Sequence, residues 1–188
     1  MIDRLSLDGS KHPNFMGCWM LENSSLCDDL IGFFERNKDI QKPGVVADGK
    51  LRETIKKSTD IMITPRDLED ENFHIVSTYV EQLKVCFLDY LEQWDFLKSV
   101  IPSVHIGSFN IQKYDEGEHY GTLHSERTSL HSLHRMLVWM TYLNDVPDGG
   151  ATEFPFFGLK INPEKGKTLI WPAEWTHAHL GAVVNKGN

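Results

Sequence analysis

A histidine and a glutamate stand one residue apart in the segment YGTLHSERTS, which covers residues 120–129. If this segment is a strand, His124 and Glu126 point to the same side of it, because alternate residues of a strand share a face. A later segment, WTHAHLG, offers two more histidines, His177 and His179. A second strand carrying one of them would complete a set of two imidazoles and one carboxylate. The spacing therefore predicts a metal site made from two distant segments.

The set of two imidazoles and one carboxylate favours a particular chemistry. Placed on one side of a metal, it leaves three octahedral positions open, which is the arrangement used by non-haem iron(II) oxygenases. The simplest alternative is a pair of ordinary polar residues, since the chain has 9 histidines and an H-x-E pair often arises by chance. A zinc hydrolase could use the same residue types, but the chain lacks the HExxH sequence common in that class. The residues alone leave these alternatives open.

The composition is that of one globular domain. The chain has 188 residues, of which 40% are hydrophobic and 24% charged, and this length can bury a sizeable core. A formal net charge of −8 argues against a protein built to hold nucleic acid or an anionic membrane, which requires a basic surface. The sequence does not indicate an oligomeric state.

The cysteines and the apolar segments bear on the compartment. Three cysteines cannot all pair with one another, so we expect reduced thiols. The start, MIDRLSLDG, lacks the apolar run of a signal peptide, and no segment reaches membrane-spanning length. We therefore expect a cytoplasmic protein.

The first hundred residues are expected to form a helical support region. Apolar residues in SSLCDDLIGFFERNKD recur at helical spacing behind a capping serine, and a longer helical pattern runs from Asp67 to about Val100. The acids of LEDENFHIV fall in the first turn of that second helix, where the helix dipole favours them. Between the helices, STDIMIT reads as a short strand.

Residues 101–188 change to short β-rich runs separated by turn sequences such as DEG, DGG and EKG. The runs are SVHIGSFNIQKY, RMLVWMTYL, ATEFPFF, GLKIN and KTLIWP. Helices followed by many strands indicate an antiparallel β-sandwich or barrel with helices on one face. No linker or repeat divides the chain, so we expect a single domain over residues 1–188.

From about residue 108 onward the sequence resembles the prolyl 4-hydroxylase-like branch of the Fe(II)/2-oxoglutarate-dependent dioxygenase superfamily. Four segments carry the resemblance and occur in the family's order: QKYDEGEHYGTLHSE, HRMLVWMTYLNDVPDGGATEFP, INPEKGKTLIWP and HAHLGAVVNKGN. The resemblance implies a mainly β fold with α, a double-stranded β-helix (jelly roll) whose N-terminal helices pack on the larger sheet.

The resemblance also implies the metal ligands His124, Glu126 and His179. Glu126 departs from the family pattern, which usually has aspartate there, and its extra methylene must be accommodated. His179 is favoured over His177 because the glycine expected eight residues after the ligand is then Gly187. His177 becomes a neighbour of the site on the same strand face.

For 2-oxoglutarate, the resemblance implies two tyrosines and a basic residue. Tyr142 matches a residue whose hydroxyl faces the distal carboxylate, and Tyr114 matches a tyrosine near the co-substrate. The basic residue is expected two positions after Gly187, where the 188-residue sequence has already ended, so we expect a truncated C-terminus. Arg135 matches a common family arginine, for which we expect a structural role in pairing with a nearby acid.

The activity implied is hydroxylation of an unactivated C–H bond, with 2-oxoglutarate and O2 consumed at Fe(II), succinate and CO2 released, and ascorbate as an accessory reductant. A prolyl residue is the first substrate implied, in a peptide, a protein or a small molecule. The alternative is a catalytically inactive metal-binding jelly roll that acts as a binding module. Glutamate in place of aspartate and the missing basic residue are the features that favour it.

Overall fold

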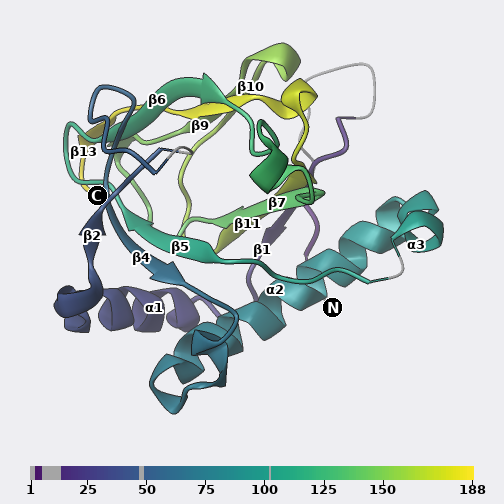
Figure 1. Cartoon of the computed structure of the whole chain (residues 1–188), viewed down its shortest axis with the longest axis horizontal. Helices are drawn as coiled ribbons and strands as arrows, with labels where there is room; N and C mark the ends of the chain where they lie inside the picture. The colour runs from purple at the N-terminus through teal and green to yellow at the C-terminus, as the bar shows by residue number, and fades with distance from the viewer. Residues whose placement is uncertain (1–2, 6–13, 47–48, 102) are drawn as a thin grey trace.

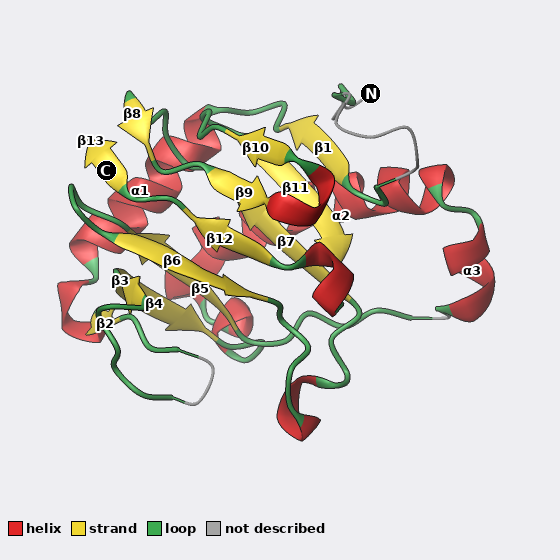
Figure 2. Cartoon of the chain, turned by 90° about the horizontal axis from the view of Figure 1, so that it is seen from above, coloured by secondary structure: helices red, strands yellow, loops and turns green. Residues whose placement is uncertain are grey.

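The computed structural model describes residues 3–5, 14–46, 49–101 and 103–188, and its strands form a jelly roll backed by helices (Figure 1). The sheet on one side, which faces the viewer in Figure 2, has the order β10-β9-β12-β6-β3. Its strands are β10 (Leu159–Ile161), β9 (Thr152–Phe154), β12 (His179–Gly181), β6 (His119–His124) and β3 (Lys56–Lys57). The expected fold class, a mainly β jelly roll with N-terminal helices, is confirmed. The helices pack on the wall made of the two three-stranded sheets and not on this five-stranded sheet.

The opposite wall contains two three-stranded sheets, with orders β1-β11-β7 and β2-β4-β5. The first contains β1 (Gly17–Met20), β11 (Lys167–Pro172) and β7 (Leu137–Thr141). The second contains β2 (Lys42–Pro43), β4 (Thr59–Ile63) and β5 (Phe109–Lys113). A further pair joins β13 (Val184–Lys186) to β8 (Asp148–Gly149). All of the pairings are antiparallel.

The helices cover the outer face of this second wall (Figure 1). They are α1 (Ser25–Arg36), α2 (His74–Gln93) and α3 (Phe96–Val100), with short 3-10 turns at η1 (Lys38–Ile40), η2 (Asp67–Glu69), η3 (Glu71–Phe73), η4 (Leu130–Ser132), η5 (Pro155–Phe157) and η6 (Trp175–His177). None of the helices in the described ranges is long and apolar enough to cross a membrane.

The second long helix begins later than its sequence pattern suggests, because the acids at its start form separate turns. Asp67 accepts hydrogen bonds from the backbone and the hydroxyl of Thr64, and Asp70 accepts one from the backbone of Asn72. Such local side-chain hydrogen bonds compete with the backbone hydrogen bonds of a continuous helix. The region 67–73 therefore holds η2 and η3, and α2 starts at His74.

Strand alternation distributes side chains between two apolar cores. In β1, Cys18 faces the space between the walls and Trp19 faces the helices. In β11, Leu169 and Trp171 face between the walls, whereas Ile170 packs with the helices. The wall is thus buried on both sides, which explains why KTLIWP is almost continuously apolar.

The first hundred residues contribute strands as well as support. β1 pairs with β11, β3 with β6, and β4 with β5. The three cysteines, Cys18, Cys27 and Cys86, are all buried, and none of them forms a disulfide.

Candidate metal centre

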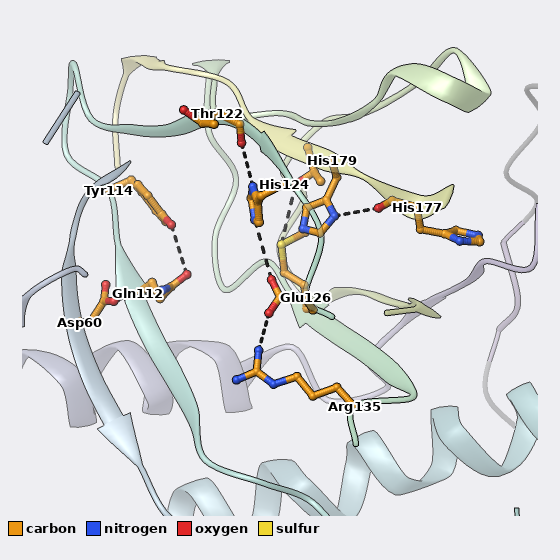
Figure 3. Close-up of polar contacts among 11 residues, drawn as sticks. Asp60, Gln112, Tyr114, Thr122, His124, Glu126, Arg135, His177 and His179 are labelled. Atoms are coloured by element: carbon orange, nitrogen blue, oxygen red, sulfur yellow. Dashed lines mark hydrogen bonds and ion pairs between the residues drawn. The ribbon is translucent and has the colours of Figure 1, made fainter. Parts of the chain in front are cut away.

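Three side chains meet between the two walls of the jelly roll. His124 is the last residue of β6, His179 is the first residue of the neighbouring β12, and the two are register partners. Glu126 lies just past the end of β6. One ligand atom from each of the three lies within 4.8 Å of the others, so that they could hold a metal ion (Figure 3). The two distant segments singled out in the sequence are therefore brought together.

The hydrogen bonds of both histidines engage Nδ1 and leave Nε2 free to bind a metal. His124 Nδ1 lies 2.8 Å from the carbonyl oxygen of Thr122, and His179 Nδ1 lies 3.0 Å from that of His177. A carbonyl oxygen only accepts, so each Nδ1 carries the proton and donates it. Each Nε2 then keeps its lone pair, which is the state required of a metal ligand.

Glu126 is held by Arg135 and approaches His124. Its Oε2 accepts a hydrogen bond of 2.6 Å from Nη1 of Arg135, and its Oε1 lies 3.7 Å from Nε2 of His124. The expected pairing of Arg135 with a nearby acid is confirmed, and the acid is the candidate ligand itself (Figure 3). The longer glutamate arm is accommodated past the end of the strand rather than on it.

His177 is placed differently from its sequence expectation. It belongs to the 3-10 turn η6, not to the strand that begins at His179, so the two histidines do not share a strand face. Its Nε2 donates to the carbonyl oxygen of Asn14 at 2.8 Å, and its Nδ1 lies 3.0 Å from the hydroxyl of Thr176. Both ring nitrogens are engaged by the protein, and His177 lies outside the cluster of possible ligands. The difference arises because the turn interrupts the strand pattern.

Aromatic rings surround the two imidazoles. Tyr120 stacks on His124 with ring centroids 3.8 Å apart, while Phe154 and Trp171 lie 5.4 and 5.1 Å from the ring of His179. Burial lowers the pKa of both histidines, and that of His179 falls to about 4 because the ring of His124 adds to the effect of desolvation. Both imidazoles are therefore neutral near pH 7, ready to bind a cation.

These shifts predict a pH-dependent stability of the metal-free protein. An unfolded histidine titrates near pH 6.5, whereas folded His179 titrates at about 4, so the unfolded chain binds more protons between these values. Stability should be greatest above pH 6.5 and should fall, by on the order of 3 kcal/mol from His179 alone, as the pH drops to 4. Urea unfolding in EDTA measures this slope, and His179→Gln should flatten it. An unchanged slope in that variant would contradict the assignment.

Tyr142 immediately follows β7, and its hydroxyl reaches across to β9. The hydroxyl lies 2.7 Å from Oγ1 of Thr152 and 3.0 Å from the carbonyl oxygen of Ile161, and it accepts a hydrogen bond from the backbone of Thr152. Burial raises its pKa to about 12, so the group is a neutral hydroxyl at physiological pH.

Tyr114 belongs to a polar network whose inner end, Lys56 and Asp60, is buried. Its hydroxyl donates to Gln112, whose amide donates to Asp60, and Asp60 also forms a 2.6 Å ion pair with Lys56. The ammonium of Lys56 lies 5.6 Å from the ring centroid of Tyr120, which in turn stacks on His124. The side chains of Lys56 and Asp60 are only 3% and 10% exposed. The network thus connects the N-terminal region to the candidate metal centre.

A signal for this network was present in the sequence. Lys56, Ser58 and Asp60 are polar residues at a spacing of two, a pattern that places three side chains on one face of an extended segment.

Comparison with known proteins finds similarity to prolyl hydroxylases in sequence and in fold. No family model matches the chain. A probable prolyl 4-hydroxylase of Arabidopsis thaliana is 32% identical over 126 residues, covering 53% of this chain and 44% of the plant protein. The match therefore spans less than half the length of that relative.

Two solved structures share the fold over most of this chain. A prolyl hydroxylase from Trichoplax adhaerens, in complex with a peptide fragment of a hypoxia-inducible factor, has a TM-score of 0.70 at 13% identity and covers 92% of this chain and 79% of its own. A viral collagen prolyl hydroxylase from Paramecium Bursaria Chlorella virus-1, solved as a 2OG complex, has a TM-score of 0.58 at 17% identity, with coverage of 92% and 90%.

The solved structures show that the chain has the jelly-roll fold of these prolyl hydroxylases. In sequence, about half of the chain is similar to a probable prolyl 4-hydroxylase.

Proposed function

We propose that the protein is an Fe(II)- and 2-oxoglutarate-dependent dioxygenase that hydroxylates an unactivated C–H bond. The observation that carries the proposal is the cluster of His124, Glu126 and His179, whose ligand atoms lie within 4.8 Å of one another. The prolyl 4-hydroxylase-like sequence supports the same assignment.

The donor set fits iron(II). Two neutral imidazole nitrogens and one carboxylate oxygen are the protein ligands of non-haem Fe(II) oxygenases. In His124 and His179 the protonated Nδ1 faces a backbone carbonyl, which leaves the lone pair of Nε2 free for a metal. Iron bound there with 2-oxoglutarate and O2 would supply the oxidation of the C–H bond, with succinate and CO2 released. The protein holds the ligands, orients the substrates and excludes water.

The two tyrosines are proposed to bind 2-oxoglutarate. Burial raises the pKa of Tyr114 and that of Tyr142, so both hydroxyls stay protonated. To donate to a carboxylate, each hydroxyl would give up its present acceptor, which is Gln112 for Tyr114 and Thr152 or Ile161 for Tyr142. We propose that Tyr142 faces the distal carboxylate and that Tyr114 lies near the end that approaches the metal.

A prolyl residue in a peptide or protein is the proposed substrate. The plant relative is named as a probable prolyl 4-hydroxylase, and the Trichoplax neighbour was solved with a peptide. The buried, free cysteines suit a reducing compartment such as the cytoplasm, which is where we propose that the protein works.

Succinate release tests the proposed activity. The purified protein, supplied with Fe(II), 2-oxoglutarate, ascorbate and proline-containing peptides, should release succinate and CO2 only when O2 is present. No turnover despite bound metal would support the inactive binding module instead. Product formation that is independent of O2 would indicate a hydrolase and would overturn the proposal.

Glu126→Asp tests the identity of the carboxylate ligand. Aspartate keeps the hard oxygen donor and has one rotatable bond fewer, so the variant should bind Fe(II) or Mn(II) at least as tightly as the original chain. Glu126→Gln removes the charge and should weaken binding strongly. Isothermal titration with Mn(II) measures both, and a loss of binding in the aspartate variant would show that Glu126 is not positioned as described.

A further inference from the structure

Glu126 and Arg135 lie on opposite ends of one loop that folds back on itself. β6 ends at His124 and β7 begins at Leu137, with the 3-10 turn η4 between them. The loop returns Arg135 to Glu126, so that its Nη1 lies 2.6 Å from Oε2 of the carboxylate (Figure 3). The other oxygen, Oε1, remains on the side of His124, at 3.7 Å from Nε2. One carboxylate oxygen thus binds the arginine, and the other lies on the side of the candidate metal position.

A glutamate at this position needs such an anchor. Its side chain has three rotatable bonds, and it stands beyond the last residue of β6, where the strand no longer fixes the backbone. Ordering a flexible side chain opposes ligation. A short charge-assisted hydrogen bond to one oxygen removes most of that freedom before a metal arrives, while it leaves the second oxygen available.

The nearest basic residue does not perform this role. Arg127 directly follows Glu126 in the sequence, but its guanidinium forms an ion pair with Glu174 at the start of η6. Among the contacts of the described residues, the ion pair with Arg135 and the approach to His124 are the two that reach the Glu126 carboxylate. The loop therefore pairs Glu126 with the arginine that is more distant in the sequence, and not with its immediate neighbour.

We infer that Arg135 is the positioning residue of the metal centre and that it allows glutamate to serve where the shorter aspartate would otherwise be needed. The inference rests on the proposed function in one respect, namely that Glu126 is a metal ligand. The positive charge of Arg135 also repels a bound cation, but the side chain is 47% exposed, so water screens that repulsion. The ordering of the carboxylate therefore outweighs it.

A double-mutant cycle with Mn(II) as the probe tests the inference. The four proteins are the original chain, Arg135→Met, Glu126→Asp and the double variant, and free Mn(II) is measured by electron paramagnetic resonance. In the glutamate background, Arg135→Met should weaken Mn(II) binding by about 10-fold, the size of typical outer-shell effects. In the aspartate background it should change binding by less than about 2-fold, because the shorter arm needs no anchor.

Arg127→Met is the matched control, because it removes an equivalent ion-paired arginine from the same loop. It should leave Mn(II) affinity unchanged in both backgrounds. If the Met variants fail to unfold cooperatively in a thermal melt, Arg135→Lys replaces them in the cycle; it keeps the charge but loses the planar fork, so a smaller weakening confined to the glutamate background is expected.

Three outcomes overturn the inference: equal losses in both backgrounds, no loss in the glutamate background, or an equal loss in Arg127→Met. Absence of Mn(II) binding in the original chain is a different result, since it removes the metal site itself and with it the proposed function.

Discussion

Replacing His179 with alanine is expected to abolish metal binding by the protein. The variant keeps only His124 and Glu126, and the loss of affinity should exceed the ~10–100-fold range that outer-shell changes produce. In the original chain, a metal present at 100 times its dissociation constant should stabilise the fold by about 2.7 kcal/mol. Thermal unfolding with and without Mn(II) should show this upward shift, and it should disappear in His179→Ala.

His177→Ala is the matched control for this experiment. His177 is buried, and its ring contacts the carbonyl of Asn14 and the ring of Phe157, so removing it should lower stability by about 1–3 kcal/mol. The backbone carbonyl that orients His179 remains in place, and the shift caused by Mn(II) should persist. If His177→Ala lost the shift and His179→Ala kept it, the distal ligand would be His177.

Lys56→Met is expected to destabilise the protein by roughly 3–5 kcal/mol, because it leaves Asp60 buried without its counter-ion. Nζ of Lys56 lies 2.6 Å from Oδ2 of Asp60. For a domain of this size, the loss corresponds to a decrease of roughly 10 °C in the midpoint of thermal unfolding. Urea unfolding followed by circular dichroism gives the free energy directly.

The neighbouring Lys57 provides the control for the buried pair. It lies in the same short strand, but its side chain is 48% exposed and its ion pair with Glu118 is 3.6 Å long. Lys57→Met should change stability by less than about 1 kcal/mol. Adding Asp60→Leu to Lys56→Met removes both buried charges and should recover part of the loss. A single variant at Lys56 as stable as the original chain would show that the pair contributes little.

The sequence predicted the elements that depend on local patterns. The apolar spacing in SSLCDDLIGFFER corresponds to α1, and the runs around KTLIWP and STDIMIT correspond to β11 and β4. The start of α2 was misplaced, because the hydrogen bonds of Asp67 and Asp70 favour separate turns over a continuous helix. Pairing between distant strands, such as β3 with β6, leaves no local signal and was not foreseen.

For the candidate site, spacing predicted which residues could meet but not how they are held. The structure brings His124, Glu126 and His179 together, and their role as ligands stays a prediction until a metal is measured. Spacing alone put His177 on the same strand as His179, whereas a 3-10 turn separates the two. The support given by Lys56 was missed, because nothing in the sequence indicates that an extended N-terminal segment closes against Tyr120.

The pairing of β1 with β11 has a consequence for how the chain folds. Gly17 and Ile170 are register partners, although roughly 150 residues separate them, and closing so long a loop slows folding. During synthesis from the N-terminus, Trp19 becomes fully buried only after the last quarter of the chain has been made. We expect refolding to be slow compared with that of helical proteins of equal length, and the nascent chain to depend on protection from aggregation until β11 and β12 emerge.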